Sequence, residues 1–253
     1  MRILVTGASA GIGAATARAL AAAGHHVLLA ARSTDRLDAL ARAISRAHGP
    51  DRVAALRLDV TEAAAHAARL AALPPEWQAL DAAVLNAGLA RGLAPVYEHS
   101  PEEIDAMVDT NVKGVLYGIR AVVPGMLARG RGHVVLIGST AGHFVYPGGT
   151  VYCATKHAVG AIALGLKQDL HGTPLRVSLV SPGLVETEFS LVRFGGDAAR
   201  ARAVYADTEP LAPEDVAEAI RFCLEAPAHV NVQEVLVTPR AQSGLAISRR
   251  PAP

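Results

Sequence analysis

The segment LVTGASAGIGAATARAL, residues 4–20, determines which architecture the chain adopts. It begins as an apolar strand, passes through a turn with Gly7, Gly11 and Gly13, and continues as an alanine-rich helix. Glycine lacks Cβ, so the turn can be tight and a phosphate can approach the backbone beside the free N–H groups of the helix N-terminus. We therefore expect a nucleotide to contact Gly7, Ser9, Gly11, Ile12 and Gly13, although a plain strand-to-helix turn also explains the spacing.

Seven short apolar runs, the first of them in this segment, are expected to form strands. They are continuous rather than alternating, which is typical of parallel strands buried on both faces. Alanine- and leucine-rich stretches long enough for helices lie between most of them, with Gly24, Pro101 and Pro213 at helix boundaries. The alternation predicts an α/β fold, a doubly wound parallel sheet with helices on both faces. The runs cover residues 3–5, 27–31, 53–58, 82–85, 134–137, 177–180 and 235–237.

The length of 253 residues suits a single domain, and we expect residues 1–253 to form it. The one long stretch without a periodic pattern spans about residues 184–212. Long irregular stretches in compact domains are commonly lids or binding loops. We therefore predict that this stretch forms a lid over the substrate.

The composition argues against several classes of partner. With 24 basic and 23 acidic residues, the chain has no charge excess that favours nucleic acid or an anionic membrane surface. Charged residues or histidines interrupt every apolar run, so we expect no membrane span. The first strand starts at residue 3, which leaves no room for a signal peptide and predicts a cytoplasmic location. The two cysteines and ten histidines lack metal-ligand spacing, so we expect no metal.

The end of the second predicted strand reads LLAARSTD, with Arg32 and Ser33 directly after the apolar run. Dinucleotide-binding folds specific for NAD usually place an acidic residue there, on the ribose 2′-hydroxyl. An arginine instead pairs with a 2′-phosphate in bidentate fashion. We therefore predict NADP as the cofactor. Asp35 lies nearby, but we expect it to cap the following helix.

Polar residues also follow the third and fourth predicted strands. Asp59 and Val60 end the segment LDV, and Asn86, Ala87 and Gly88 belong to LNAG. Ligands of open α/β sheets bind at the carboxyl ends of the strands, so we expect these five residues to contact the cofactor. A helix cap at Asp59 and a turn residue at Asn86 remain open as alternatives.

The segment TVYCATKHAV, residues 150–159, places Tyr152 and Lys156 four positions apart. On a helix these side chains lie on one face. Taken alone, the segment is also explained by a half-buried tyrosine beside a lysine that reaches water. The other motifs of the chain decide between the two interpretations.

The chain resembles the short-chain dehydrogenases/reductases over nearly its whole length. The resemblance is carried, in this order, by TGASAGIG, LNAG, Asn111, Ser139, YCATK and SPG. It implies a Rossmann-type fold with a seven-stranded parallel sheet, a nicotinamide cofactor and a catalytic tetrad of Asn111, Ser139, Tyr152 and Lys156. Two positions depart from the commoner patterns of that family, Gly138 in place of a serine and Leu85 in place of an asparagine, and neither belongs to the tetrad.

The chemistry of such a site explains these residue types. Transfer of a hydride at a carbon that bears oxygen also requires transfer of a proton at that oxygen. A free tyrosine has a pKa of about 10, but a lysine ammonium and an oxidised nicotinamide nearby both favour the phenolate. We therefore expect Tyr152 to be the acid/base and Ser139 to hydrogen-bond the substrate oxygen. A strand-end cap at Ser139 and a buried structural amide at Asn111 remain open.

The resemblance implies further contacts with the cofactor. Lys156 is expected to hold the nicotinamide ribose as well, and Asn111 to place a water that connects Lys156 with solvent. The segment VSPGLVETEFS follows the sixth predicted strand and is expected to contact the nicotinamide. The contacting residues there are Pro182, Gly183, Val185 and Thr187.

The segments GSTAG, DLHG, SPGLVETEFSLVRFGGD and PAHVNVQEVLVTP are similar to one branch of that family, the NADP-dependent 3-hydroxy acid dehydrogenases that also oxidise serine and allo-threonine. This similarity implies a small substrate with a carboxylate and assembly as a homotetramer. A carboxylate needs a cation. Arg193 is our first candidate and Arg91 the second, although arginines on loops are often solvated. Phe144 and Tyr146 are expected to line the substrate pocket or to pack as structural aromatics.

Two other functions remain open from the sequence. One is a reductase of a different ketone or aldehyde, because loops change specificity readily on a shared fold. The other is a catalytically silent NADP-sensing protein, against which the complete tetrad argues.

Overall fold

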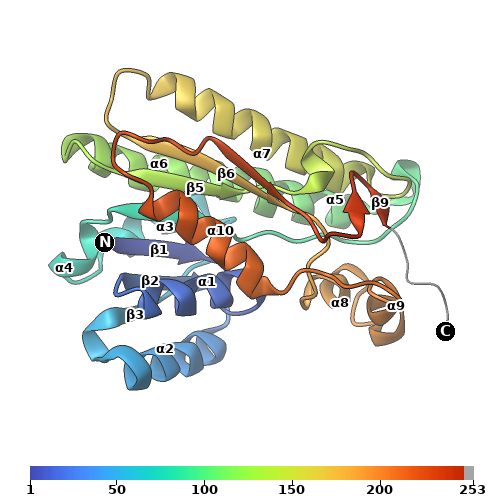
Figure 1. Cartoon of the computed structure of the whole chain (residues 1–253), viewed down its shortest axis with the longest axis horizontal. Coiled ribbons are helices and arrows are strands. Elements are labelled where there is room, and N and C mark those ends of the chain that lie inside the picture. Colours follow the sequence, from blue (N-terminus) through green and yellow to red (C-terminus); the bar gives the residue numbers. More distant parts are fainter. Residues whose placement is uncertain (248–253) are drawn as a thin grey trace.

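A computed structural model describes residues 1–247, so the end of the predicted domain, 248–253, lies outside the described part. Seven parallel strands form one sheet in the order β3-β2-β1-β4-β5-β6-β7 (Figure 1). The predicted doubly wound, seven-stranded parallel sheet is confirmed, and every strand ends within two residues of its predicted range. The strands are β1 (Arg2–Thr6), β2 (His26–Ala31), β3 (Val53–Arg57), β4 (Ala82–Leu85), β5 (His133–Ile137), β6 (Arg176–Pro182) and β7 (Glu234–Val237).

Ten α-helices are found among residues 1–247. The longer ones occupy the predicted helical stretches between the strands, whereas α8 and α9 belong to the stretch that we expected to be irregular. The helices are α1 (Gly11–Ala22), α2 (Thr34–His48), α3 (Ala63–Ala71), α4 (Pro75–Gln78), α5 (Pro101–Val108), α6 (Gly114–Ala128), α7 (Thr150–Asp169), α8 (Phe189–Arg193), α9 (Ala198–Ala203) and α10 (Pro213–Glu225).

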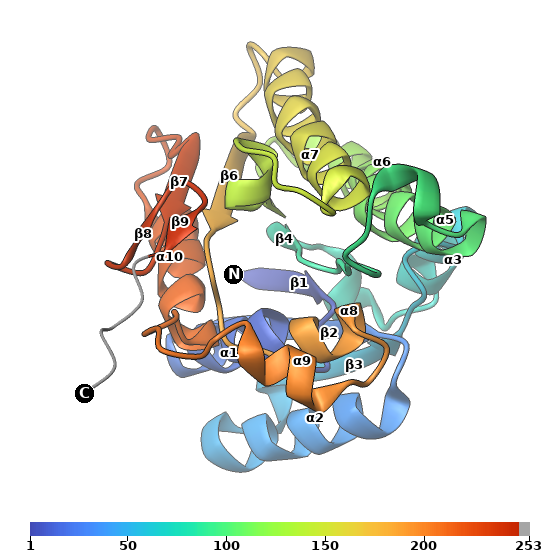
Figure 2. The same cartoon turned by 90° about the vertical axis from the view of Figure 1, so that its right-hand side faces the viewer.

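The sheet is buried on both faces, because successive residues of a strand point to opposite sides. Val5 and Leu29 lie on the face covered by α1, α2 and α10. Leu4 and Leu28 lie on the other face, in one core with residues of α4, α6 and α7. Figure 2 shows α1 and α2 on one side of the strands and α6 and α7 on the other. This two-sided cover explains why the strands are continuous apolar runs.

Local signals fix where several helices begin and end. Pro101 is the first residue of α5, and the Ser100 hydroxyl before it accepts a hydrogen bond from the Glu103 amide. Pro213 is likewise the first residue of α10. Gly24 follows α1 with a φ of +85°, a left-handed conformation that glycine adopts without strain. These three helix boundaries agree with the sequence prediction.

The carboxyl ends of the strands form the edge at which the site is built. The strand order reverses beside β1, which pairs with β2 on one side and with β4 on the other. In open α/β sheets this reversal leaves a crevice outside the strand ends. Beyond it lie α8, α9 and a C-terminal hairpin of β8 (Gln242–Ser243) and β9 (Ala246–Ile247) (Figure 2).

The stretch at residues 184–212 is less irregular than expected. It contains α8 and α9, and the Asp197 carboxylate caps α9 by accepting from the Ala199 and Arg200 amides. A parallel bridge between Val185 and Leu211 joins the two ends of the stretch. The segment therefore leaves and rejoins the body of the protein at one point. None of the helices in residues 1–247 has the length and apolarity needed to cross a bilayer.

Candidate active site

A cavity of about 930 Å³ opens at the carboxyl ends of the strands. It runs from Arg32 at the end of β2 to Tyr152 in α7. Gly13, Asn111 and Phe144 are the three predicted site residues that do not line it. The predicted residues that do are Gly7, Ser9, Gly11, Ile12, Arg32, Ser33, Asp59, Val60, Asn86, Ala87, Gly88, Ser139, Tyr146, Tyr152, Lys156, Pro182, Gly183, Val185, Thr187 and Arg193.

The glycine turn between β1 and α1 is shaped by close backbone approaches. Gly7 has a φ of +65°, and a Cβ there would lie 2.9 Å from Cα of Ala87. Gly13 lies under the turn rather than in the cavity, and a Cβ there would overlap the carbonyl oxygen of Gly7. No side chain caps the N-terminus of α1, and its first turn holds no acidic residue. The N–H groups of this turn are therefore suited to an anion.

Basic and acidic groups meet at the ends of β2 and β3. Ser33 is the N-cap position of α2, and Asp35 is the second residue of that helix, so Asp35 does not occupy the predicted cap. Burial raises the pKa of Asp59, but hydrogen bonds from Thr61 and the charge of Arg32 outweigh it, and the pKa of Asp59 is lowered. Arg32 itself faces the cavity and supplies a positive charge at this end.

Asn86 ties the end of β4 to the end of β1. Its side-chain nitrogen donates to the carbonyl of Thr6 at 2.9 Å, and its main-chain N–H donates to the Thr6 hydroxyl at 3.0 Å. The residue is therefore more than a turn former, because it spans the point where the strand order reverses. Ala87 and Gly88 continue from it along the cavity wall.

Asn111 is buried and lies in a π-helical turn, Asp109–Lys113, between α5 and α6. Its side-chain oxygen accepts from the Leu89 amide at 2.9 Å, and its nitrogen donates to Leu89 and to the Thr155 hydroxyl. These bonds reach the β4 segment and α7, so the amide is not satisfied within its own helix. Turns of this kind are frequent at functional sites. A Cβ on Gly88 would lie 3.3 Å from Asn111 Oδ1 and 3.6 Å from Lys156 Nζ. The side chains of Asn111 and Lys156 therefore both lie beside Gly88.

Ser139, Tyr152 and Lys156 come together at the end of β5. Ser139 follows this strand, accepts a hydrogen bond from the Ala141 amide at 3.1 Å and also hydrogen-bonds Tyr152. Lys156 Nζ lies 5.9 Å from the centre of the Tyr152 ring and donates to the carbonyl of Ile137 at 2.9 Å. Ser139 is thus a cap of the following turn and a partner of the tyrosine at once. The cap is thus observed, while the hydrogen bond from Ser139 to the substrate oxygen stays a prediction.

Burial acts on both ionisable groups of this cluster. It raises the pKa of Tyr152, and the hydrogen bond with Ser139 and the charge of Arg193 only partly oppose this rise. Burial also lowers the pKa of Lys156 to about 8. From the sequence we expected the Lys156 ammonium to lower the pKa of Tyr152 toward neutral pH. In the structure the charge of Arg193 opposes the rise in the Tyr152 pKa, and desolvation makes the charged form of Lys156 less favourable.

Arg193 ends α8 and lies among three aromatic rings. Its guanidinium carbon is 5.2 Å from the centre of the Tyr152 ring, 5.5 Å from that of Tyr146 and 5.7 Å from that of Phe189. Nη2 donates to the Tyr146 hydroxyl, whereas Nε is buried without a hydrogen-bond partner within residues 1–247. A half-buried cation with a buried, unpaired donor beside the tyrosine is suited to bind an anionic group.

Phe144 was expected to line the substrate pocket or to pack as a structural aromatic, and it does not line the cavity. Its side chain is 42% exposed, and its ring lies against Gly244 in the C-terminal hairpin, where a Cβ would be 3.5 Å away. The turn after β5 carries the ring outward, while Tyr146, two residues later, points inward. Arg91, the second candidate for the carboxylate, lines the cavity but donates to the carbonyl of Val192 at 3.1 Å.

The turn after β6 lies beside the far end of the glycine turn. Gly183 donates to the carbonyl of Val237 at 2.7 Å, and a Cβ on Gly11 would lie 3.4 Å from Thr187. The Thr187 hydroxyl accepts from the Phe189 amide at 3.2 Å and so caps the entry to α8. Gln242 accepts from the Leu184 amide at 2.8 Å and joins the hairpin to this turn.

Sequence reasoning missed several residues of the cavity wall. Arg36 and Glu188 form an ion pair of 2.6 Å that joins α2 to the start of α8, and both line the cavity. Leu245 and Ile247 enter the wall from the C-terminal hairpin. Glu188 lies within the segment that we quoted for the nicotinamide, but nothing in the sequence pattern indicated that the hairpin would reach the cavity.

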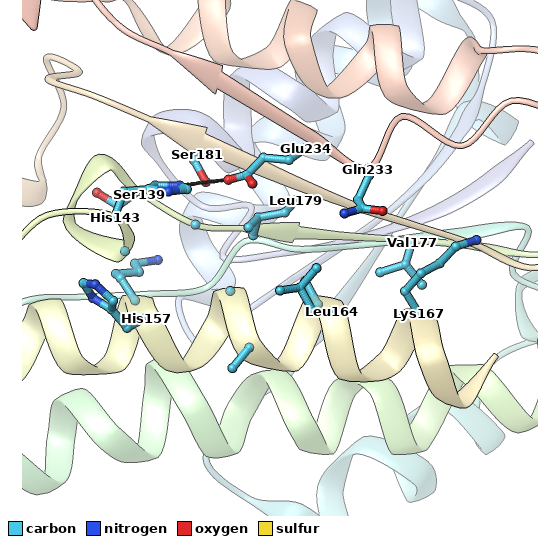
Figure 3. A pocket seen from close by; sticks show the side chains of 16 residues that line it. Ser139, His143, His157, Leu164, Lys167, Val177, Leu179, Ser181, Gln233 and Glu234 are labelled. Carbon is cyan, nitrogen blue, oxygen red and sulfur yellow. Dashed lines mark hydrogen bonds and ion pairs between the residues drawn. The ribbon is translucent and has the colours of Figure 1, made fainter. Parts of the chain in front are cut away.

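A second cavity of about 370 Å³ lies behind Ser139, between α7 and the strands β6 and β7 (Figure 3). His143 Nε2 contacts Glu234 at 2.8 Å there, and the Ser181 hydroxyl donates to the same carboxylate at 3.2 Å. A Cβ on Gly138 would lie 2.5 Å from the Ser181 oxygen, which explains why a glycine replaces the serine common at this position. No group of three potential metal ligands is found in the part of the chain that the structure describes.

Comparison with known proteins gives one family. A family model described as short chain dehydrogenase matches residues 1–193. The chain is 46% identical over 252 residues to the NADP-dependent 3-hydroxy acid dehydrogenase YdfG of Salmonella typhimurium, covering 98% of this chain and 100% of that protein. It is 42% identical over 250 residues to sulfoacetaldehyde reductase 2 of Chromohalobacter salexigens, covering 98% of each.

Solved structures of dehydrogenases are also similar to this chain. The closed form of serine dehydrogenase complexed with NADP+ matches with a TM-score of 0.93 at 45% identity, covering 99% of this chain and 100% of that one. An alcohol dehydrogenase from the archaeon Thermococcus sibiricus, complexed with 5-hydroxy-NADP, matches with a TM-score of 0.82 at 30% identity, covering 96% and 97%. The likeness therefore extends over nearly the whole chain.

Proposed function

The chain belongs to the short-chain dehydrogenase family, and from this membership we propose that it interconverts a short 3-hydroxy acid and its 3-oxo form. It is an NADP-dependent enzyme that acts on CH–OH groups. Serine and related β-hydroxy acids belong to the proposed substrate class. The single observation that carries the substrate class is the buried, unpaired Nε of Arg193 beside Tyr152.

The residues present fit a dinucleotide with a 2′-phosphate. The uncapped N-terminus of α1 is suited to the pyrophosphate, and the tight turn before it requires Gly7 and Gly13, where a Cβ would overlap neighbouring protein atoms. Arg32 and Ser33 lie at the end of β2, where the 2′-phosphate is bound in this kind of fold. The assignment of individual residues to NADP is part of the proposal. Besides the glycine turn, these residues are Arg32, Ser33, Asp59, Val60, Asn86, Ala87, Gly88, Tyr152, Lys156, Pro182, Gly183, Val185 and Thr187.

The chain's own residues then perform the proton chemistry. NADP supplies the hydride acceptor for oxidation and the donor for reduction. Ser139 holds the substrate oxygen, and Tyr152 takes the proton from that oxygen in oxidation or returns it in reduction. Lys156 keeps a positive charge beside the tyrosine and binds the cofactor ribose. Asn111 is buried next to Lys156 and is proposed to hold the water through which protons reach solvent.

The position of Arg193 limits the size of the substrate. Its guanidinium carbon lies only 5.2 Å from the Tyr152 ring centre, so an anion on Arg193 and an oxygen on Tyr152 must be close together. A short spacer between carboxylate and hydroxyl meets this requirement, as in 3-hydroxypropionate, 3-hydroxyisobutyrate and serine. The stretch at residues 184–212, which carries Arg193, is proposed to act as the lid over this substrate.

The same geometry leaves one alternative substrate class. A sulfonate carries the same charge as a carboxylate, and the chain is similar to a sulfoacetaldehyde reductase. Reduction of a short anionic aldehyde is therefore the second candidate. A catalytically silent NADP-sensing protein is the third, and the clustering of Ser139, Tyr152 and Lys156 at the cavity argues against it.

Assembly and location belong to the proposal as well. We propose a homotetramer formed through the long helices on the flank of the sheet, where Leu116, Leu127 and Leu164 are exposed on α6 and α7. Light scattering would give four times the mass of one chain if this is correct. The cytoplasmic location and the lack of nucleic-acid partners stay predictions from the sequence.

The function is tested with a panel of substrates and both cofactors, followed at the absorbance band of the reduced nicotinamide. The panel contains serine, 3-hydroxypropionate, 3-hydroxyisobutyrate and, in the reverse direction, sulfoacetaldehyde. Turnover of the 3-hydroxy acids with NADP supports the proposal, and turnover of sulfoacetaldehyde alone supports the alternative. Arg193→Ala is then expected to raise KM for the 3-hydroxy acids, and an unchanged KM would remove Arg193 as the anchor.

A further inference from the structure

Tyr146 holds the Arg193 side chain in place. The Tyr146 hydroxyl accepts a hydrogen bond from Nη2, and its ring lies 5.5 Å from the guanidinium carbon. The tyrosine ring is itself fixed by Gly149, because a Cβ at that position would overlap the ring. Tyr146 therefore restrains the arginine from the turn between β5 and α7, an element far from α8 in the sequence.

The backbone of Arg193 is restrained from another side. Its carbonyl accepts a hydrogen bond from the Gly92 amide at 2.9 Å, and the preceding carbonyl, of Val192, accepts from Arg91 at 3.1 Å. The end of α8 is thus joined to the segment after β4. With the backbone fixed here and Nη2 fixed by Tyr146, Nε is the remaining buried donor, and it has no partner in the described chain.

The chemistry of the partner determines what the arginine can still bind. Burial raises the pKa of Tyr146, so the phenol stays neutral at the pH at which enzymes work. A neutral hydroxyl orients a guanidinium without cancelling its charge, whereas a carboxylate in the same place would neutralise it. Arg193 therefore keeps a full positive charge and a free donor for an anion from outside the chain.

We propose that Tyr146 is a positioning residue that orients the Arg193 guanidinium for a substrate carboxylate, and that it thereby selects acids over neutral alcohols of the same length. This inference rests on the proposed function, since it takes Arg193 as the anchor. Tyr146 itself acts through the arginine and need not touch the reacting atoms. Its removal changes how well the acid binds and leaves the chemical step intact.

The test compares 3-hydroxypropionate with its neutral analogue 3-hydroxypropionamide in Tyr146→Phe. This variant keeps the ring against Gly149 and removes only the hydroxyl that accepts from Arg193. We expect KM for the acid to rise about tenfold, the effect of losing one charge-assisted hydrogen bond, with kcat and the parameters for the amide unchanged. Tyr97→Phe is the matched control, because that ring is 83% exposed and lies outside the cavity lining.

A double-mutant cycle shows whether Tyr146 acts through Arg193. Tyr146→Phe is expected to have no further effect on KM for the acid in an Arg193→Ala background. Full additivity of the two changes would overturn the proposal, as would an equal rise in KM for acid and amide. If Tyr146→Phe fails to fold, Tyr146→Met serves instead, because it also removes the hydroxyl that accepts from Arg193, and the same selective rise is expected.

Failure of the proposed function would look different. Wild-type enzyme that uses acid and amide equally well refutes a carboxylate site before any variant is made. A wild-type preference for the acid that Arg193→Ala abolishes and Tyr146→Phe leaves intact would retain the proposed function and refute the role of Tyr146 alone.

Discussion

Lys156 lies beside Tyr152, with Nζ 5.9 Å from the ring centre, but its hydrogen bond goes to the carbonyl of Ile137. Within residues 1–247 no hydrogen bond joins the ammonium to the phenol. Burial lowers the pKa of Lys156 to about 8 and raises the pKa of Tyr152. Arg193, at the end of α8, is a second cation near the tyrosine, and its charge lowers the pKa of Tyr152.

The charge of Arg193 should therefore be visible in the pH dependence of oxidation. Arg193 lowers the pKa of Tyr152, so Arg193→Ala raises it, and the rising limb of the pH–rate profile moves to higher pH. The profile is measured with 3-hydroxypropionamide, so that the loss of a carboxylate anchor does not contribute. Arg18→Ala, on the exposed side of α1, is the control. A limb that stays in place in Arg193→Ala would show that the arginine does not act on Tyr152.

Arg32 is expected to determine the choice of cofactor. Arg32→Ala removes the cation at the end of β2, so KM for NADP should rise about 10- to 100-fold while KM for NAD changes little. Steady-state kinetics with both cofactors measures the two values. Arg46→Ala serves as the control, because this arginine lies in the last turn of α2, away from the cavity. An equal loss with NADP and NAD would contradict a contact with the 2′-phosphate.

The parts of the fold that follow from local pattern were predictable. The five inner strands, β1, β2, β4, β5 and β6, are buried on both faces, and continuous apolar runs report that burial directly, whereas the edge strands β3 and β7 keep exposed residues. The glycine turn and the residues at the strand ends were also predictable, because parallel strands bring their carboxyl ends to one edge. Pro101 and Pro213 begin their helices as expected, since a first helical residue needs no N–H partner.

The parts that depend on tertiary contacts were not predictable. The helices α8 and α9 are short and have no periodic pattern, and the hairpin that carries Leu245 is joined to the turn after β6 by the tertiary hydrogen bond from the Leu184 amide to Gln242. The direction of Phe144 depends on the turn after β5, which points it toward Gly244. The electrostatics of Tyr152 depend on how deeply it is buried, and residue spacing does not report burial.

Gly13 should be among the least replaceable glycines of the chain. A Cβ there overlaps the Gly7 carbonyl, and a backbone atom cannot move aside as a flexible side chain can. Gly13→Ala is therefore expected to lower the free energy of unfolding by about 1–3 kcal/mol and to weaken NADP binding. Urea unfolding and titration calorimetry measure the two effects.

Gly165→Ala is the matched control for this change. Gly165 is exposed within α7, and a Cβ there would meet nothing within 4 Å. Alanine should therefore raise the free energy of unfolding by about 0.5–1 kcal/mol through helix propensity. If both variants behaved alike, the clash at Gly13 would not be the cause of its effect.

His133 should make the fold sensitive to acid. It is buried at the start of β5, and burial lowers its pKa from 6.5 to about 3. Its Nε2 donates to the Ser178 hydroxyl, whose own proton goes to the Val232 carbonyl, and Nδ1 has no partner within residues 1–247. The ring is therefore neutral in the native state.

Because the pKa of His133 is lower in the folded chain than in the unfolded chain, the stability of the fold decreases as the pH falls. The unfolded chain binds a proton at His133 below pH 6.5 and the folded chain does not. The contribution of His133 to the free energy of unfolding is therefore fully present above pH 6.5 and is lost as the pH falls toward 3. The slope for one such group is about 1.4 kcal/mol per pH unit. Urea unfolding of His133→Leu from pH 8 to pH 4 should show a shallower decline than wild type. Parallel declines would mean that other groups cause the acid sensitivity.

The central claim is that Tyr152 transfers the proton at the substrate oxygen. The most direct test is the kcat for oxidation of 3-hydroxyisobutyrate with NADP by Tyr152→Phe, with cofactor binding measured on the same sample. We predict that kcat falls by about 10²- to 10⁴-fold while NADP still binds, because the ring remains and only the acid/base is lost. Wild-type kcat in Tyr152→Phe would contradict the account.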